Sequence, residues 1–143
     1  MRTDVGDCWD HFVVTYWYPD GVIMDFSSTQ FVKGFHDMCV RVYGAEGTVE
    51  THYGGDVRIR NGDKWEGGST GAIFREGAVN NIKDFCESIR TARYLNNAAE
   101  SVGSNLAAIL GRIAAYEGRL VTWDEMMAAN ARLDGRLRGL KDA

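Results

Sequence analysis

The three histidines of this chain are the side chains best suited to proton transfer or metal binding near neutral pH. His11 ends the stretch Asp7-Cys8-Trp9-Asp10-His11, which is rich in residue types that bind metal ions. In an extended strand Asp7 and His11 point the same way about 13 Å apart, which is too far to share one ion. We therefore expect no metal site here. His11 remains a candidate substrate contact, with a structural or interface role as the alternative.

His36 and Asp37 follow a glycine, Gly34, in a segment expected to be a loop. Binding residues are often found on loops, so His36 is a second candidate substrate contact. The alternative is a solvated loop tip without a functional role. His52 lies between two expected turns, and we predict no function for it.

Arg41 lies between two valines in an expected strand, so its side chain projects from the face opposite theirs. It can bind an anionic substrate group or pair with Glu50 on the next strand.

Trp65 can stack on a sugar ring, or it can be a core or interface residue. The stretch 67–71 (GGSTG) has the composition of an anion-binding loop but lacks the GxxxxGK[ST] spacing, so we expect a flexible crossover. The sequence contains no GxSxG, HExxH or GxGxxG motif, and we predict no catalytic residue and no metal ligand.

These candidates are carried by an expected series of six β-strands between about residues 10 and 66. Dense β-branched and aromatic runs alternate with turn residues such as Pro19-Asp20-Gly21 and Asn61-Gly62. Short turns make consecutive strands antiparallel neighbours. The strands are expected over 12–18, 22–31, 38–43, 48–53 and 57–60, with a sixth beginning at Lys64 and Trp65.

Three helices are expected between about residues 75 and 133, where apolar residues recur every three or four positions. The predicted helices cover 75–93, 98–117 and 123–133. Gly118 is expected to end the second helix, and Thr122 and Glu125 form a capping box for the third. The charged end, 134–143, is expected to be frayed. The fold class is therefore α+β, a single domain over 1–143 with a largely antiparallel open sheet of about six strands and helices on one face.

The other face of this sheet is expected to be covered by a second copy or another domain. The first strand carries aromatic residues on both faces, and the helices can cover only one of them. The expected faces are Phe12, Tyr16 and Tyr18 on one side and Trp9, Trp17 and His11 on the other. We therefore predict that the chain forms a homo-oligomer through the open face.

Composition excludes several classes of function. The net charge is −4 without a basic cluster, which argues against binding to nucleic acid or an anionic membrane. Three cysteines, Cys8, Cys39 and Cys86, are far apart in sequence and are typical of reduced thiols in a reducing compartment. No apolar run approaches the roughly 20 residues of a membrane span, and a signal-peptide core is absent. We expect a cytoplasmic protein.

Two segments are the most characteristic of the chain: 43–50 (YGAEGTVE), and 111–116 (GRIAAY) continuing through 121–123 (VTW). With GDCWDHFVVTYWYPDG near the start, they resemble the C-terminal half of the glucose-fructose oxidoreductase, inositol dehydrogenase and rhizopine-catabolism (Gfo/Idh/MocA) family, from about residue 6 to 133. The resemblance implies an NAD(P)-dependent oxidoreductase of sugars or polyols. It also implies an N-terminal Rossmann domain and a C-terminal domain whose open sheet mediates oligomerisation.

The family's cofactor-binding glycines, its catalytic lysine in a Glu-Lys-Pro segment and its helical Asp/Asn-x-x-x-His motif lie upstream of the matched region. Asp7 and His11 have the spacing of that last motif, but the family's motif lies in a helix and these two residues are expected in a strand. We therefore expect a piece of a longer protein: a substrate-side and oligomerisation domain that is not catalytic alone, with NAD or NADP bound by the missing Rossmann domain or partner. His11, His36, Arg41 and Trp65 would line the pocket for a sugar or polyol. The alternatives are a non-enzymatic dimeric module that binds a separate partner, or a domain of an NAD-dependent glycosidase.

Overall fold

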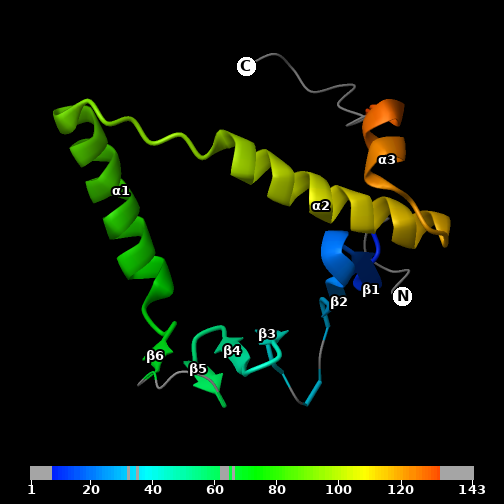
Figure 1. The fold of residues 1–143 in the computed structure, drawn as a ribbon, viewed down its shortest axis with the longest axis horizontal. Helices are drawn as coiled ribbons and strands as arrows, with labels where there is room; N and C mark the ends of the chain where they lie inside the picture. Colours follow the sequence, from blue (N-terminus) through cyan, green and yellow to red (C-terminus); the bar gives the residue numbers. More distant parts are fainter. Residues whose placement is uncertain (1–7, 32, 35, 62–64, 66, 133–143) are drawn as a thin grey trace. The chain divides into compact units, whose positions relative to one another are not determined.

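A computed structural model describes residues 8–31, 33–34, 36–61, 65 and 67–132 of the chain. The α+β class is confirmed, because six strands precede three helices in these residues (Figure 1). A single 3-10 turn, Pro19–Gly21, connects the first two strands. The elements are β1 (His11–Trp17), β2 (Ile23–Thr29), β3 (Cys39–Tyr43), β4 (Thr48–His52), β5 (Asp56–Arg60), β6 (Gly68–Ser69), α1 (Ile73–Thr91), α2 (Ala98–Glu117) and α3 (Trp123–Ala129).

The strands form two antiparallel sheets where we expected one open sheet. β1 pairs with β2, and a separate sheet has the order β3-β4-β5-β6. The chain comprises two compact units, and the single domain expected over 1–143 stays a prediction. The hairpin unit comprises 1–31 and 97–143, and the sheet unit comprises 32–96.

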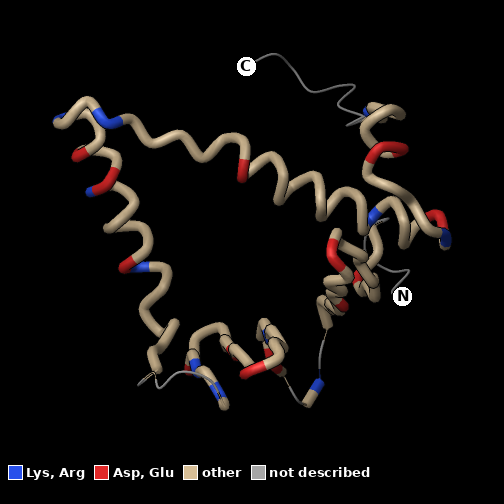
Figure 2. Tube along the Cα trace, viewed as in Figure 1, with Lys and Arg blue, Asp and Glu red and all other residues tan. Residues whose placement is uncertain are grey.

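The hairpin unit is built on the contact between β1 and α2, whose ribbon crosses the hairpin in Figure 1. Alternate residues of β1 are half-buried, as expected for a strand with one covered face. The Tyr16 hydroxyl donates a hydrogen bond to the backbone oxygen of Ala107 (3.2 Å), and Gly111 is buried beneath the same ring. α2 suits this role because most of its length carries no charge (Figure 2). Small residues on α2 thus let the helix approach the strand closely.

Trp9 packs on the α2 side of the hairpin, where we had expected it on the opposite face with His11 and Trp17. Its indole stacks on the ring of Tyr116 (centroids 4.6 Å apart), and its backbone N–H donates to the Tyr116 hydroxyl (3.0 Å). The expectation was wrong because β1 begins at His11, so the two-residue alternation does not extend back to Trp9. His11 and Trp17 do lie on the outward face.

The predicted signals between α2 and α3 are confirmed. Gly118 has the left-handed conformation (φ 62°) that ends α2, and its N–H donates to Ala114. The Thr122 hydroxyl oxygen accepts a hydrogen bond from the backbone N–H of Glu125 (3.2 Å). The Glu125 carboxylate pairs with Arg119 (2.6 Å), which ties the connection to the first turn of α3.

α3 ends at Ala129, earlier than the expected residue 133. Asn130 adopts the left-handed conformation (φ 41°) and donates its N–H to the backbone oxygen of Met126. Asparagine tolerates this conformation better than most residues, which explains the stop. Residue 133 and the expected frayed end lie outside the described residues.

The sheet unit separates polar from apolar side chains on its two faces. Residues two apart on a strand share a face, and the register places Arg41 opposite Glu50 and Val42 opposite Val49. The polar face carries Cys39, Arg41, Glu50, His52, Arg58 and Arg60 together with Tyr43, and the apolar face carries Val40, Val42, Val49, Val57 and Ile59 together with Thr51. Val40 is 62% exposed and Val42 is 57% exposed, so the apolar face is open within this unit.

The sixth strand is not where we expected it. β6 is formed by Gly68 and Ser69, which pair with Val57 and Asp56 of β5, whereas Trp65 is outside the strand. Lys64 lies outside the described residues. The segment expected to be a flexible crossover therefore supplies the edge strand, because its small residues fit beside β5.

α1 leaves its apolar side chains exposed within the sheet unit. It runs over Ile73–Thr91, two residues earlier than expected at each end. Ile82 is 65% exposed, and Phe85 is similarly exposed. At the start of the helix, the ring of Phe74 lies edge-on to Tyr53 with centroids 5.6 Å apart. Among the described residues, no helix combines the length and hydrophobicity needed to cross a membrane.

We predict that Gly111→Ala destabilises the hairpin unit while Gly103→Ala stabilises it. A Cβ at 111 would overlap the Tyr16 hydroxyl and ring, whereas a Cβ at 103 would meet no atom within 4 Å. Overpacking costs about 1–3 kcal/mol, and replacing a helix-interior glycine by alanine gains about 0.5–1 kcal/mol. Urea denaturation of the two variants and the wild type measures the difference in the free energy of unfolding. Equal effects of the two substitutions would contradict the close packing of α2 on β1.

Candidate functional site

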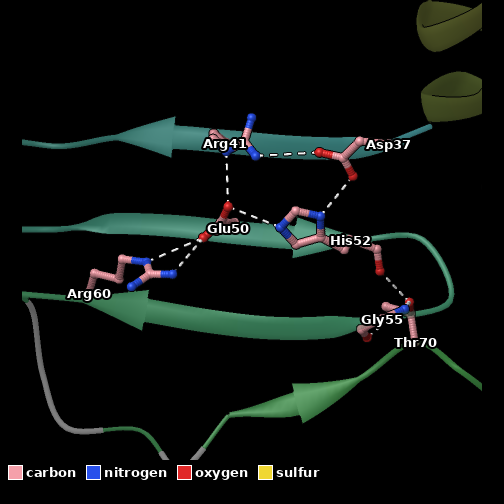
Figure 3. A network of polar contacts seen from close by, with 7 residues as sticks. All are labelled: Asp37, Arg41, Glu50, His52, Gly55, Arg60 and Thr70. Carbon is pink, nitrogen blue, oxygen red and sulfur yellow. Dashed lines mark hydrogen bonds and ion pairs between the residues drawn. The ribbon is translucent and has the colours of Figure 1, made fainter. Parts of the chain in front are cut away.

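The polar face of β3–β5 carries a connected network of ion pairs (Figure 3). Glu50 lies at its centre on β4 and is 14% exposed. Its Oε1 accepts a hydrogen bond from Arg41 Nε (3.0 Å), and its Oε2 accepts two from Arg60 (3.2 Å each). The pairing of Arg41 with Glu50 was one of the two predicted roles for Arg41, and it is confirmed.

His52 joins two carboxylates within this network, although we predicted no function for it. Its Nδ1 lies 2.8 Å from Asp37 Oδ1, and its Nε2 lies 2.9 Å from Glu50 Oε1. Asp37 also approaches Arg41, with its Oδ2 3.5 Å from Nη2. The spacing of Glu50 and His52, two residues apart on one strand, was the available signal, because it places both side chains on one face.

Thr70 holds the backbone around His52 in place (Figure 3). Its hydroxyl donates to the backbone oxygen of His52 (2.5 Å) and accepts a hydrogen bond from the N–H of Gly55 (3.2 Å). The Thr70 N–H in turn donates to the Gly55 oxygen (2.8 Å). Thr70, the residue after β6, therefore stabilises the turn between β4 and β5 through these hydrogen bonds. The 67–71 stretch thus has a structural role that we did not predict.

The electrostatics of the network favour charged forms of its members. Hydrogen bonds to Asp37 and Glu50 raise the pKa of His52 above its usual value. Hydrogen bonds from His52, Arg41 and Arg60 lower the pKa of Glu50 to about 2. The hydrogen bond with His52 likewise lowers the pKa of Asp37. The imidazolium form of His52 is thus stabilised, and this form cannot accept a proton as a general base.

Cys39 lies directly opposite His52 in the pairing of β3 with β4. Desolvation and a hydrogen bond to Asp37 raise the pKa of the Cys39 thiol, so the arrangement does not prepare a thiolate nucleophile. One ligand atom each from Asp37, Cys39 and His52 lie within 4.8 Å of one another. A carboxylate, a thiol and an imidazole thus converge at one end of the network, and this combination can bind a metal ion.

Of the four predicted substrate contacts, only Arg41 belongs to this network. His36 is exposed, one residue before Asp37. Trp65 is exposed beside Gly68 of β6. His11 belongs to the hairpin unit, where its Nδ1 lies 2.7 Å from Asp10. As substrate contacts, all four remain predictions.

No protein-family model, curated protein or solved structure matches this chain.

We predict that the pKa of His52 is raised above 6.5 and falls in Asp37→Asn and Glu50→Gln variants. The decrease should be larger for Asp37→Asn, because the hydrogen bond to Asp37 is the largest cause of the shift. NMR titration of the imidazole Cε1–H resonance measures this value. Asp56→Asn is the matched control, since Asp56 pairs with Arg58. An unchanged pKa in Asp37→Asn would contradict the network.

The sign of the shift also determines how stability depends on pH. A pKa that is higher in the folded than in the unfolded state contributes stability that is fully present below the unfolded value near 6.5. This contribution is lost as the pH rises through the folded pKa of His52. His52→Gln should therefore be less sensitive to pH than the wild type across this window, as measured by urea denaturation. Parallel pH profiles for the two proteins would contradict the raised pKa.

Proposed function

We propose that this chain is the substrate-side and oligomerisation domain of an NAD(P)-dependent sugar or polyol oxidoreductase of the Gfo/Idh/MocA type, without catalysis of its own. The observation that carries the proposal is the division of the β3–β5 sheet into two unlike faces. On one face the charged side chains form ion pairs with one another, and the other face presents exposed valines and an isoleucine. A sheet with this division is suited to association through its apolar face.

Burial of the apolar face supplies the driving force for association. Val40 and Val42 are more than half exposed, and Val49 and Ile59 are each more than a third exposed. Full burial of such a side chain is worth about 1.5–3 kcal/mol. Because the four side chains lie on neighbouring strands of one sheet, a second copy or a neighbouring domain can cover them together.

The polar face favours a neutral, hydroxyl-rich substrate over an anion. Arg41 is already paired with Glu50 and Asp37, so its charge is neutralised within the network. An arginine in this state can still donate hydrogen bonds to sugar or polyol hydroxyls. We propose Arg41 and His36 as substrate contacts of the sheet unit, with Trp65 as a further candidate there. His11 belongs to the hairpin unit and stays a separate candidate substrate contact. NAD or NADP would be bound by the Rossmann domain.

We predict that the protein associates in solution and that Val42→Lys weakens the association. A lysine at this position would place a charge on the apolar face and oppose its burial. Tyr43→Lys is the matched control, because Tyr43 is the next residue on β3, is 77% exposed and projects from the opposite face. Sedimentation velocity at micromolar concentration measures the molar mass. A compact wild-type monomer, or equal effects of the two lysines, would contradict the proposed interface.

We also predict that the chain alone does not bind NAD(H) or NADP(H) with micromolar affinity. The residues that bind the cofactor in the resembled family lie outside the matched region. Isothermal titration calorimetry with each of the four nucleotides tests this expectation. Saturable micromolar binding at one site per chain would contradict the assignment of the cofactor to another domain.

A further inference from the structure

We propose that Asp37, Cys39 and His52 form a binding site for a zinc-class divalent metal ion with an open fourth position. The three side chains supply one oxygen, one sulfur and one nitrogen ligand. Zinc accepts all three ligand types, whereas calcium and magnesium prefer sites made of oxygen atoms. This site lies in the sheet unit and does not depend on the proposed association.

The geometry of the cluster is close to that of a three-ligand site. The three ligand atoms lie within 4.8 Å of one another, and Asp37 Oδ1 is 2.8 Å from His52 Nδ1. A tetrahedral zinc ion bound at about 2.0–2.3 Å holds its ligand atoms roughly 3.3–3.8 Å apart. Small side-chain rotations that separate Asp37 from His52 and bring Cys39 inward are sufficient to reach this arrangement.

Backbone pairing sets the relative positions of two of the three ligands, and Asp37 lies in the segment just before β3. Cys39 and His52 are directly paired across β3 and β4, and Asp37 precedes Cys39 by two residues. Sites supported by paired strands are more precise than sites on loops alone. The hydrogen bond from Thr70 to the His52 backbone fixes the end of β4 on the other side. Ion binding would therefore require little backbone movement.

The outer partners of a metal site are already in place. His52 Nε2 lies 2.9 Å from Glu50 Oε1, so the imidazole can bind the ion through Nδ1 while Nε2–H donates to a carboxylate. Arg41 and Arg60 hold that carboxylate, and Arg41 also approaches the second oxygen of Asp37. A carboxylate behind a histidine ligand orients the ring and increases its basicity.

Cys39 supplies the sulfur ligand of the proposed site. Its thiol forms a hydrogen bond with Asp37 and lies within 4.8 Å of the ligand atoms of Asp37 and His52. On binding, the ion would take Cys39 as a thiolate and His52 as a neutral imidazole, and the displaced protons would pass to solvent. The thiolate and the Asp37 carboxylate then balance the two positive charges of the ion.

Titration of the full reduced chain with Co²⁺ tests the proposal, because cobalt occupies zinc sites and is coloured. We expect one Co²⁺ per chain, a thiolate-to-cobalt charge-transfer band and the visible bands of a tetrahedral ion, all removed by added Zn²⁺. Cys39→Ser should abolish the charge-transfer band. Cys86→Ser is the matched control, since Cys86 is an exposed thiol on α1 of the same unit, and it should leave the spectrum unchanged.

Glu50, the carboxylate beside His52, gives a test in which binding should weaken without being lost. Glu50→Gln should preserve the tetrahedral spectrum and weaken Co²⁺ binding roughly 10–100-fold. Asp37→Asn and His52→Gln should lose the tetrahedral bands. Absence of cobalt binding by the wild type, or a charge-transfer band that survives in Cys39→Ser, would overturn the proposal.

A measurement on the wild type guards against a Cys39→Ser variant that fails to fold. Zn²⁺ should protect Cys39 from alkylation by iodoacetamide, while Cys86 continues to react. Mass spectrometry of the digested protein measures the extent of labelling at each cysteine. Equal labelling of Cys39 with and without Zn²⁺ would also overturn the proposal.

Discussion

The two-residue period of β3, β4 and β5, set in one register, is the constraint on which the sheet unit depends. It places Glu50 and His52 on one face and Val49 on the other. A shift of β4 by one residue would turn both charged side chains onto the apolar face and remove their partners. The same register therefore produces the ion-pair network and the open apolar face. Cross-strand pairing of Arg41 with Glu50 reinforces it, because opposite charges directly across two strands stabilise their pairing.

The two units obtain their stability from different interactions. In the hairpin unit, Tyr16 and the residues that share its face pack on α2, where Gly111 permits close approach. In the sheet unit, the polar face relies on ion pairs between partly exposed groups, which generally contribute little to the free energy of folding. Burial of the exposed apolar area on the valine face and on α1 would stabilise this unit further, and that burial requires another surface to cover the area. The hairpin unit also exposes apolar side chains on the outward face of its strands, among them Val13 and Trp17.

Local signals in the sequence predicted most elements of the fold, and long-range pairing explains the errors. Turn residues located five strands, and Gly118 and Thr122 marked the helix ends as observed. The division into two sheets depends on which strands pair, which no single segment specifies. The role of His52 could not be predicted for a similar reason, because it depends on residues from other segments of the chain. Its significance comes from Asp37, Cys39 and Glu50, which only the register and the preceding loop bring to it.

The proposed association and the proposed metal site are compatible because they use opposite faces of one sheet. The charges of the polar face are paired with one another, so covering this face would require desolvating several ions for little gain. The valine face carries no such cost. Cys39 and His52 project from the polar face, so an ion bound there would keep its open position accessible while the valine face is covered. Association would therefore leave the polar face free for the proposed sugar or polyol substrate, and an ion at the proposed metal site would lie on that same face.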